Sequence, residues 1–125
     1  MDEAEDLKTL RKDIMEMVYL SKEGHLPSAF SILELLYVLY GNFLKYDSKN
    51  PDSIERDFFI LSKGHGSQAL YAVLAHYGFF EKDKVFSFCN FDSLFGGHPD
   101  KNKVPGVEAS TGSLGHGFPM ALGIA

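Results

Sequence analysis

The stretch ILSKGHGSQALYAVLAHYG, residues 60–78, joins an apolar segment to an apolar helix through a turn in which two glycines flank a histidine. The run FFIL at 58–61 is short, aromatic and branched, which is typical of a buried strand in a sheet covered on both faces. Residues Ser67 to Tyr77 predict a helix that stops at Gly78. Two interpretations of the KGHG turn stay open on these residues alone. The glycines either permit a tight turn, or let backbone N–H groups approach an anion at the helix N-terminus.

The elements on either side of this stretch indicate an α/β fold. Apolar residues at helical spacing predict a helix over residues 3–22, with acidic side chains in its first turn. A second helix, from Pro27 to Phe43, is apolar on nearly all sides and is therefore expected to be buried. We expect a short helix over 81–88, a long surface loop over 89–112 and an apolar helix in the last residues. A parallel sheet flanked by helices would fit this order, although only one strand is evident.

The composition indicates a folded protein with no broad polyanion-binding surface. The 125 residues suffice for one domain, and 45% of them are hydrophobic. The net charge is −5 and no long basic run occurs, so we expect no nucleic-acid partner. Cys89 is the only cysteine, which excludes an internal disulfide and favours a reducing compartment. The longest apolar stretch is interrupted by Glu34 and is shorter than the roughly 20 residues of a membrane helix, so we expect a cytoplasmic protein without a membrane partner.

The histidines are the candidate functional residues. His25, His65, His98 and His116 lie in glycine-bearing breaks. His76 lies within the apolar run YAVLAHYG and is expected to be a helix-end or surface histidine. Ligands of α/β folds bind where loops gather at the carboxyl ends of strands, and histidine exchanges protons near neutral pH. The structural alternative for each is a turn that carries a polar residue. A zinc site is less favoured, because the sequence has neither a cysteine pair nor HExxH spacing.

Three segments in unbroken order carry a family resemblance: KEGHLPSAFSILELLYVLY (22–40), RDFFILSKGHGSQALYAVLAHYGFF (56–80) and GGHPDKNKVPGVEASTGSLGHGFPMALGIA (96–125). Together they resemble the beginning of transketolases, above all the N-terminal subunits of split transketolases. The resemblance implies a partial thiamine-diphosphate-binding fold, in which residues 1–125 form the incomplete N-terminal portion of the diphosphate-binding domain. The implied reaction transfers a two-carbon ketol unit between sugar phosphates.

The resemblance also implies roles for individual residues. His25 and His98 match the catalytic histidines that face the sugar substrate, and His65 matches the histidine beside the cofactor's diphosphate. Gly112, Ser113 and Leu114 match the TG-x-LG stretch, which contacts the cofactor largely through its backbone. On this interpretation, the glycines of KGHG clear space beside the diphosphate. Lys63 either contacts a phosphate or, as the preferred alternative, has a structural role.

Several family features are altered or lie outside the chain. His116 replaces the glutamine of the family's LGQG, and the magnesium motif, Gly-Asp-Gly followed by an asparagine, would come after residue 125. The resemblance thus implies thiamine diphosphate and Mg²⁺ as cofactors, with the metal ligands elsewhere. It also implies a dimeric assembly with a C-terminal subunit or domain that carries the pyrimidine-binding site.

We expect the isolated chain to be inactive and poorly folded, because part of its packing surface and its metal motif would be missing. Two alternatives stay open: a truncated, non-catalytic remnant that binds a related subunit, and a sugar-phosphate-binding module without chemistry. The sequence does not identify the sugar.

Overall fold

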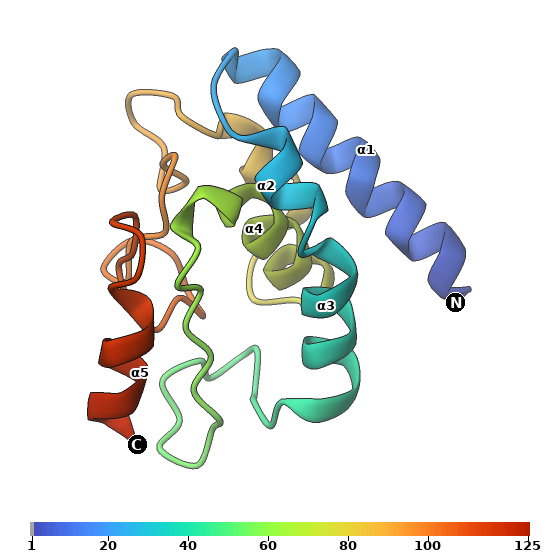
Figure 1. Cartoon of the computed structure of the whole chain (residues 1–125). Coiled ribbons are helices and arrows are strands. Elements are labelled where there is room, and N and C mark those ends of the chain that lie inside the picture. The colour runs from blue at the N-terminus through green and yellow to red at the C-terminus, as the bar shows by residue number, and fades with distance from the viewer. Residues whose placement is uncertain (1) are drawn as a thin grey trace.

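A computed structural model describes residues 2–125, which form a helical assembly around one central helix. That helix, α4 (Ser67–His76), is contacted by α1 (Glu3–Ser21), α2 (Leu26–Phe30), α3 (Leu33–Val38) and η3 (Lys82–Ser87), as Figure 1 shows. The remaining elements are the π-helix η1 (Leu39–Phe43), the 3₁₀ turn η2 (Gly64–Gly66) and the C-terminal helix α5 (Gly117–Ile124). Residues 67–75 of α4 are all buried, so this helix is the core against which the other elements pack.

The helix expected over residues 3–22 is confirmed as α1. The Asp2 carboxylate accepts a hydrogen bond from the Ala4 backbone N–H at 3.1 Å, which caps the first turn. The buried side chains Leu10, Ile14 and Met17 follow helical spacing and belong to the hydrophobic core. Lys22 ends the helix in the left-handed conformation.

The single buried helix expected from Pro27 to Phe43 is wrong in two respects. The chain breaks between α2 and α3 at Ser31 and Ile32, where Ile32 has a φ of −124°. This break lies against η2, because a Cβ on Gly66 would lie 2.5 Å from Ile32 Cδ1. Leu35 is also 60% exposed, so one side of α3 is not covered within residues 2–125.

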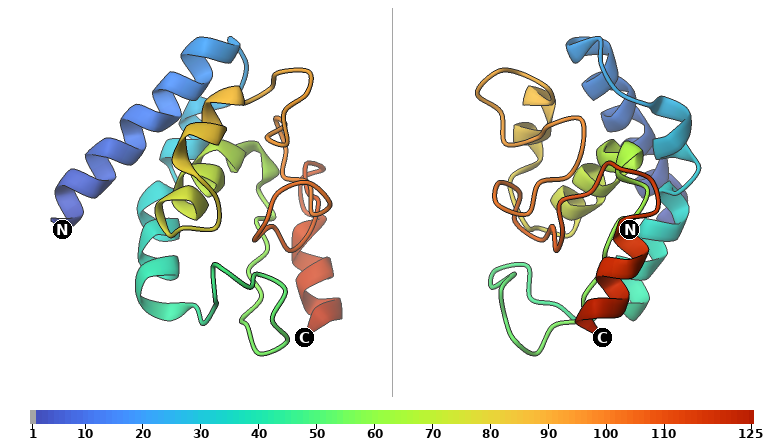
Figure 2. Two further views of the ribbon diagram at one scale, coloured as in Figure 1. Left: turned by 180° about the vertical axis from the view of Figure 1, so that it is seen from behind. Right: turned by 60° about the vertical axis from the view of Figure 1, so that its left-hand side comes forward.

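No strand forms within residues 2–125, so the expected sheet is not confirmed and residues 58–61 are not a strand. A strand requires a neighbour that exchanges backbone hydrogen bonds with it. The segment instead runs as irregular chain beside α5, as both Figure 1 and Figure 2 show. One of its carbonyls, that of Leu61, accepts a hydrogen bond from the Thr111 hydroxyl at 2.7 Å.

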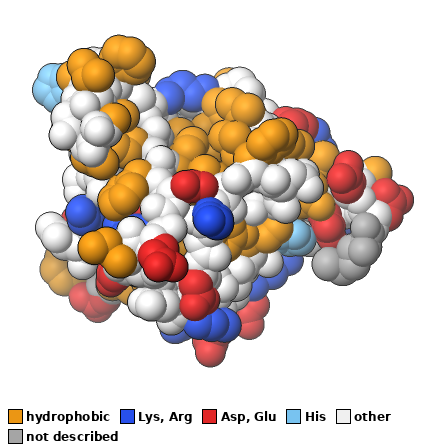
Figure 3. All heavy atoms as spheres, turned by 90° about the horizontal axis from the view of Figure 1, so that it is seen from below, with side chains coloured by type: hydrophobic (Ala, Val, Ile, Leu, Met, Phe, Trp, Pro, Cys, Tyr) orange, Lys and Arg blue, Asp and Glu red, His pale blue; other side chains and the backbone are white. Residues whose placement is uncertain are grey.

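The second half of the chain agrees with expectation more closely. The residues from 89 to 112 contain no helix or strand, the segment 81–88 contains η3, and α4 ends before Gly78, whose φ is +83°. Helix α5 is apolar, and its Phe118 and Leu122 are more than 70% exposed. Hydrophobic side chains gather in broad patches on the face of the molecule shown in Figure 3.

Candidate functional site

Three histidines from three separate loops meet at the N-terminal end of α4. His25 precedes α2, His65 lies in η2, and His98 lies in the loop that follows η3. The ring centroids of His25 and His65 are 4.8 Å apart, and so are those of His65 and His98. The rings meet nearly edge to face, with interplanar angles of 76° and 89°. We call these three residues the histidine cluster.

His65, at the centre of the cluster, has an unused polar atom. Its Nδ1 is buried and has no hydrogen-bond partner within the described residues. A buried nitrogen without a partner is unfavourable by about 1–3 kcal/mol, so such an atom suggests a missing ligand group. The imidazole nitrogen can donate to an anionic oxygen or accept from a hydroxyl.

Gly64, the first glycine of KGHG, allows the backbone of Thr111 and Gly112 to approach the turn closely. A Cβ on Gly64 would lie 2.8 Å from both Gly112 N and Thr111 C. The Thr111 hydroxyl is tied to the Leu61 carbonyl on the same side, at 2.7 Å. The backbone of Thr111 and Gly112, which we call the TG stretch, therefore lies directly against the KGHG turn. Only glycine at position 64 permits this approach.

The TG stretch also contacts the histidine cluster. A Cβ on Gly112 would lie 3.0 Å from His98 Cδ2. Partial desolvation lowers the pKa of His98 below its usual 6.5, and the nearby His65 and His25 lower it further. His98 is therefore neutral at pH 7 and can both donate and accept a proton.

An open hollow of about 420 Å³ begins at His98 and Gly112, and neither His25 nor His65 lines it. It is lined by His98, Ser110, Thr111, Gly112, Ser113, His116 and Met120. The predicted residues Gly112 and Ser113 thus lie at the hollow with His98. Leu114 does not line it, and its side chain is 70% exposed.

The family model for the thiamine diphosphate binding domain of transketolase matches residues 3–125. The chain belongs to the transketolase family. One of the subunits of apulose-4-phosphate transketolase from Actinobacillus succinogenes is 44% identical over 102 residues, which is 82% of this chain and 37% of that protein. A Rhodococcoides fascians protein named ferredoxin fas2 is 45% identical over 103 residues, which is 82% of this chain and 34% of that protein. Transketolase from Leishmania mexicana superposes with a TM-score of 0.88 at 32% identity, over 99% of this chain and 19% of that chain.

The chain thus spans little more than a third of these curated relatives. Transketolases have an α/β fold, although residues 2–125 of this family member form no strand. The name ferredoxin has no counterpart in this chain's composition. Iron–sulfur clusters are held by several cysteine thiolates, and this chain has one cysteine.

The other residues considered from the sequence lie away from the histidine cluster or face elsewhere. Lys63 Nζ donates to the Ser31 hydroxyl at 2.7 Å, which supports its structural interpretation. His76 Nε2 lies 3.7 Å from Asp6 Oδ2, at the far end of α4. Burial raises the pKa of the Cys89 thiol, and the Glu23 charge raises it further, so this cysteine is protonated at neutral pH.

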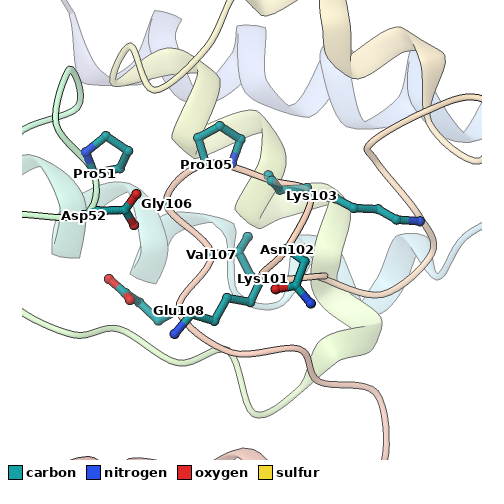
Figure 4. A pocket seen from close by; sticks show the side chains of 10 residues that line it. Pro51, Asp52, Lys101, Asn102, Lys103, Pro105, Gly106, Val107 and Glu108 are labelled. Carbon is teal, nitrogen blue, oxygen red and sulfur yellow. The ribbon is translucent and has the colours of Figure 1, made fainter.

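A second hollow, of about 250 Å³, lies between the 101–108 loop and residues Pro51 and Asp52 (Figure 4). None of the predicted site residues lines it. Its Glu108 carboxylate already receives two hydrogen bonds, from Arg56 Nε at 2.6 Å and Arg56 Nη2 at 2.8 Å. This carboxylate therefore has a structural role, since the ion pair joins two loops.

Sequence reasoning missed the buried polar residues that lie under the histidines. Ser67, Gln68 and Thr111 are all less than 9% exposed, and the hydroxyls of Ser67 and Thr111 donate to loop carbonyls. A glutamine in the first turn of a mostly apolar, buried helix was the available signal. Within residues 2–125, no group of three histidine, cysteine or acidic residues could hold a metal ion. No helix of the described part of the chain is both long and apolar enough to cross a membrane.

Proposed function

We propose that this chain is part of a thiamine-diphosphate-dependent transketolase, which transfers a two-carbon ketol unit between sugar phosphates. The observation that carries the proposal is the convergence of His25, His65 and His98 beside the backbone contact between Gly64 and Gly112. It is supported by family membership and by the name of the Actinobacillus succinogenes relative, a transketolase of a sugar phosphate. The non-catalytic alternative is not favoured, because every one of these site features is present.

The residues at the KGHG turn fit a diphosphate. His65 has a free buried nitrogen, and Gly64 lets the backbone of the KGHG turn meet the backbone of Thr111 and Gly112 without a side chain between them. In our proposal, His65 donates to the diphosphate, and backbone groups of 112–114 contact the cofactor, with Gly112 and Ser113 at the hollow. When bound, thiamine diphosphate supplies the carbanion stabilisation that carbon–carbon bond cleavage requires.

The outer two histidines are assigned to the sugar. His25 and His98 are exposed on one side and flank His65, so their free nitrogens are available to hydroxyl groups. His98, neutral at pH 7, donates a hydrogen bond to an oxygen that gains negative charge or takes a proton from a hydroxyl. Such a group typically contributes about a hundredfold or more to the rate.

The remaining parts of the active site are proposed to come from outside residues 1–125. Mg²⁺ takes about six oxygen ligands, and we assign its protein ligands to other residues of the full-length polypeptide. The pyrimidine-binding site is assigned to a C-terminal subunit or domain, in a dimeric and cytoplasmic assembly. The Actinobacillus succinogenes relative is named as one subunit of its enzyme, which supports a partner of this kind.

The test is an assay of ketol transfer by the full-length polypeptide together with its partner subunit. We expect formation of product from a ketose phosphate donor and an aldose phosphate acceptor only when thiamine diphosphate is present. Sugar-phosphate binding that is indifferent to thiamine diphosphate, with no transfer, would contradict the proposal and support a binding module instead.

A further inference from the structure

Gln68 places a carboxamide between the backbones of two members of the histidine cluster. Its side chain is 0% exposed and leaves the first turn of α4. With its Oε1 toward His25, it accepts from the His25 backbone N–H at 2.9 Å, and its Nε2 donates to the His65 carbonyl at 3.3 Å. The opposite orientation would set donor against donor and acceptor against acceptor, so the hydrogen-bond network assigns this one.

Tyr71, one turn further along the same face of α4, holds the third member. Its side chain is 0% exposed, and its hydroxyl lies 2.9 Å from the Gly96 carbonyl and 3.0 Å from the His98 carbonyl, so its single hydrogen is shared between these two acceptors. The Ser67 hydroxyl donates to the Gly97 carbonyl at 2.8 Å. One face of α4 is thus bonded to the main chain at or beside all three histidines.

The loop before α2 is shaped for contact with Gln68. A side chain on Gly24 would collide with the Gln68 carboxamide, and Gly24 has a φ of +113°, which favours glycine. Apart from Ser67, Gln68 and Tyr71, the buried residues of α4 are all aliphatic. An aliphatic side chain would therefore satisfy packing at position 68, and an amide is not needed for that purpose. A buried carboxamide without partners would be destabilising. The histidine backbones supply those partners.

We infer that Gln68 and Tyr71 are positioning residues that hold the histidine cluster at its present spacing. Gln68 fixes His25 relative to His65, and Tyr71 fixes the loop of His98 relative to α4. The consequence for catalysis rests on the proposed function. There, a displacement of about 1 Å in a group that orients substrate can lower the rate by about a hundredfold.

The test compares two variants and a control in the full-length polypeptide labelled at histidine. Gln68→Met keeps a side chain of similar length but removes both hydrogen bonds, and Tyr71→Phe removes only the hydroxyl. Val73→Ala is the control, since Val73 is 0% exposed in the same helix but has no polar group. Imidazole NMR spectra, recorded without cofactor, report the surroundings of each ring, and kcat and KM are measured with cofactor.

We expect Gln68→Met to shift the ring resonances of His25 and His65, and Tyr71→Phe to shift those of His98. The Val73→Ala control should lower the melting temperature and leave all three unchanged. We expect kcat to fall at least about tenfold in Gln68→Met with a smaller change in KM. Unshifted resonances in Gln68→Met, or equal shifts in the control, would overturn the inference. If the full-length protein has no transketolase activity, the resonances still decide this inference, because they need no cofactor.

If Gln68→Met does not fold, Gln68→Glu replaces it. A carboxylate keeps an acceptor toward the His25 N–H but has no donor for the His65 carbonyl. Above the pH at which this carboxyl ionises, we expect a larger shift of the His65 resonances in Gln68→Glu than in Val73→Ala. His65 resonances that match the control would overturn the inference in this case too.

Discussion

Replacing Gly64 by alanine tests whether the backbone contact at the KGHG turn forms the cofactor site. The new Cβ would lie 2.8 Å from Gly112 N, 2.8 Å from Thr111 C and 2.9 Å from Thr111 O. All three are backbone atoms, and the Thr111 hydroxyl anchors this stretch to the Leu61 carbonyl, so the contact cannot relax by a side-chain rotation. Overpacking of this kind typically costs about 1–3 kcal/mol. If the strain falls on the geometry that binds cofactor, the affinity drops by about five- to 150-fold.

The assay is calorimetric titration of the full-length polypeptide with thiamine diphosphate in the presence of Mg²⁺. Gly96→Ala is the matched control, because its new Cβ would meet only the His98 carbonyl, at an ordinary 3.6 Å. We expect weak cofactor binding in Gly64→Ala and near-normal binding in Gly96→Ala. The reasoning is refuted if Gly64→Ala binds the cofactor and melts like the wild type.

Three further predictions concern the histidine cluster. His98→Ala should lower turnover by about a hundredfold or more while cofactor affinity, measured by fluorescence titration, stays nearly intact; the reverse pattern would contradict its substrate role. His65→Ala should weaken thiamine diphosphate binding by about ten- to 150-fold, and normal binding would make the KGHG histidine structural. Because the pKa of His98 is lowered in the folded state from its usual 6.5, the unfolded chain binds more protons, so stability should fall as the pH drops below about 6.5. Melting temperatures between about pH 5 and 8 should show a smaller acid loss in His98→Asn than in the wild type, and parallel curves would contradict this.

Helix α1 could be predicted from the sequence, because the residues that specify it lie within the helix itself. Residues 3–22 carry an N-terminal acidic turn and helical apolar spacing, and they form α1. The break at Ser31 and Ile32 has no such signal in the sequence, and it lies against Gly66, which comes from a distant part of the chain. The segment 58–61 has strand-like residues, but within residues 2–125 it has no neighbouring strand with which to pair.

The histidines of the candidate site could also be predicted from the sequence, whereas the residues that hold them could not. The glycine-bearing breaks pointed to His25, His65, His98 and His116. The structure brings the first three together, and His116 lines the hollow beside His98. Gln68 was missed, because its partners are the backbone groups of His25 and His65, and no sequence pattern specifies which main-chain atoms a buried amide will meet.

In this proposal the KGHG turn and the TG stretch receive a diphosphate, with the free Nδ1 of His65 available to it. Comparing the binding of thiamine diphosphate with that of unphosphorylated thiamine tests this role. Titration of the full-length polypeptide and its partner subunit, in the presence of Mg²⁺, should show thiamine diphosphate bound at least about a hundredfold more tightly than thiamine, and His65→Ala should reduce this preference. Equal affinity for the two compounds, or a preference unchanged by His65→Ala, would contradict the account.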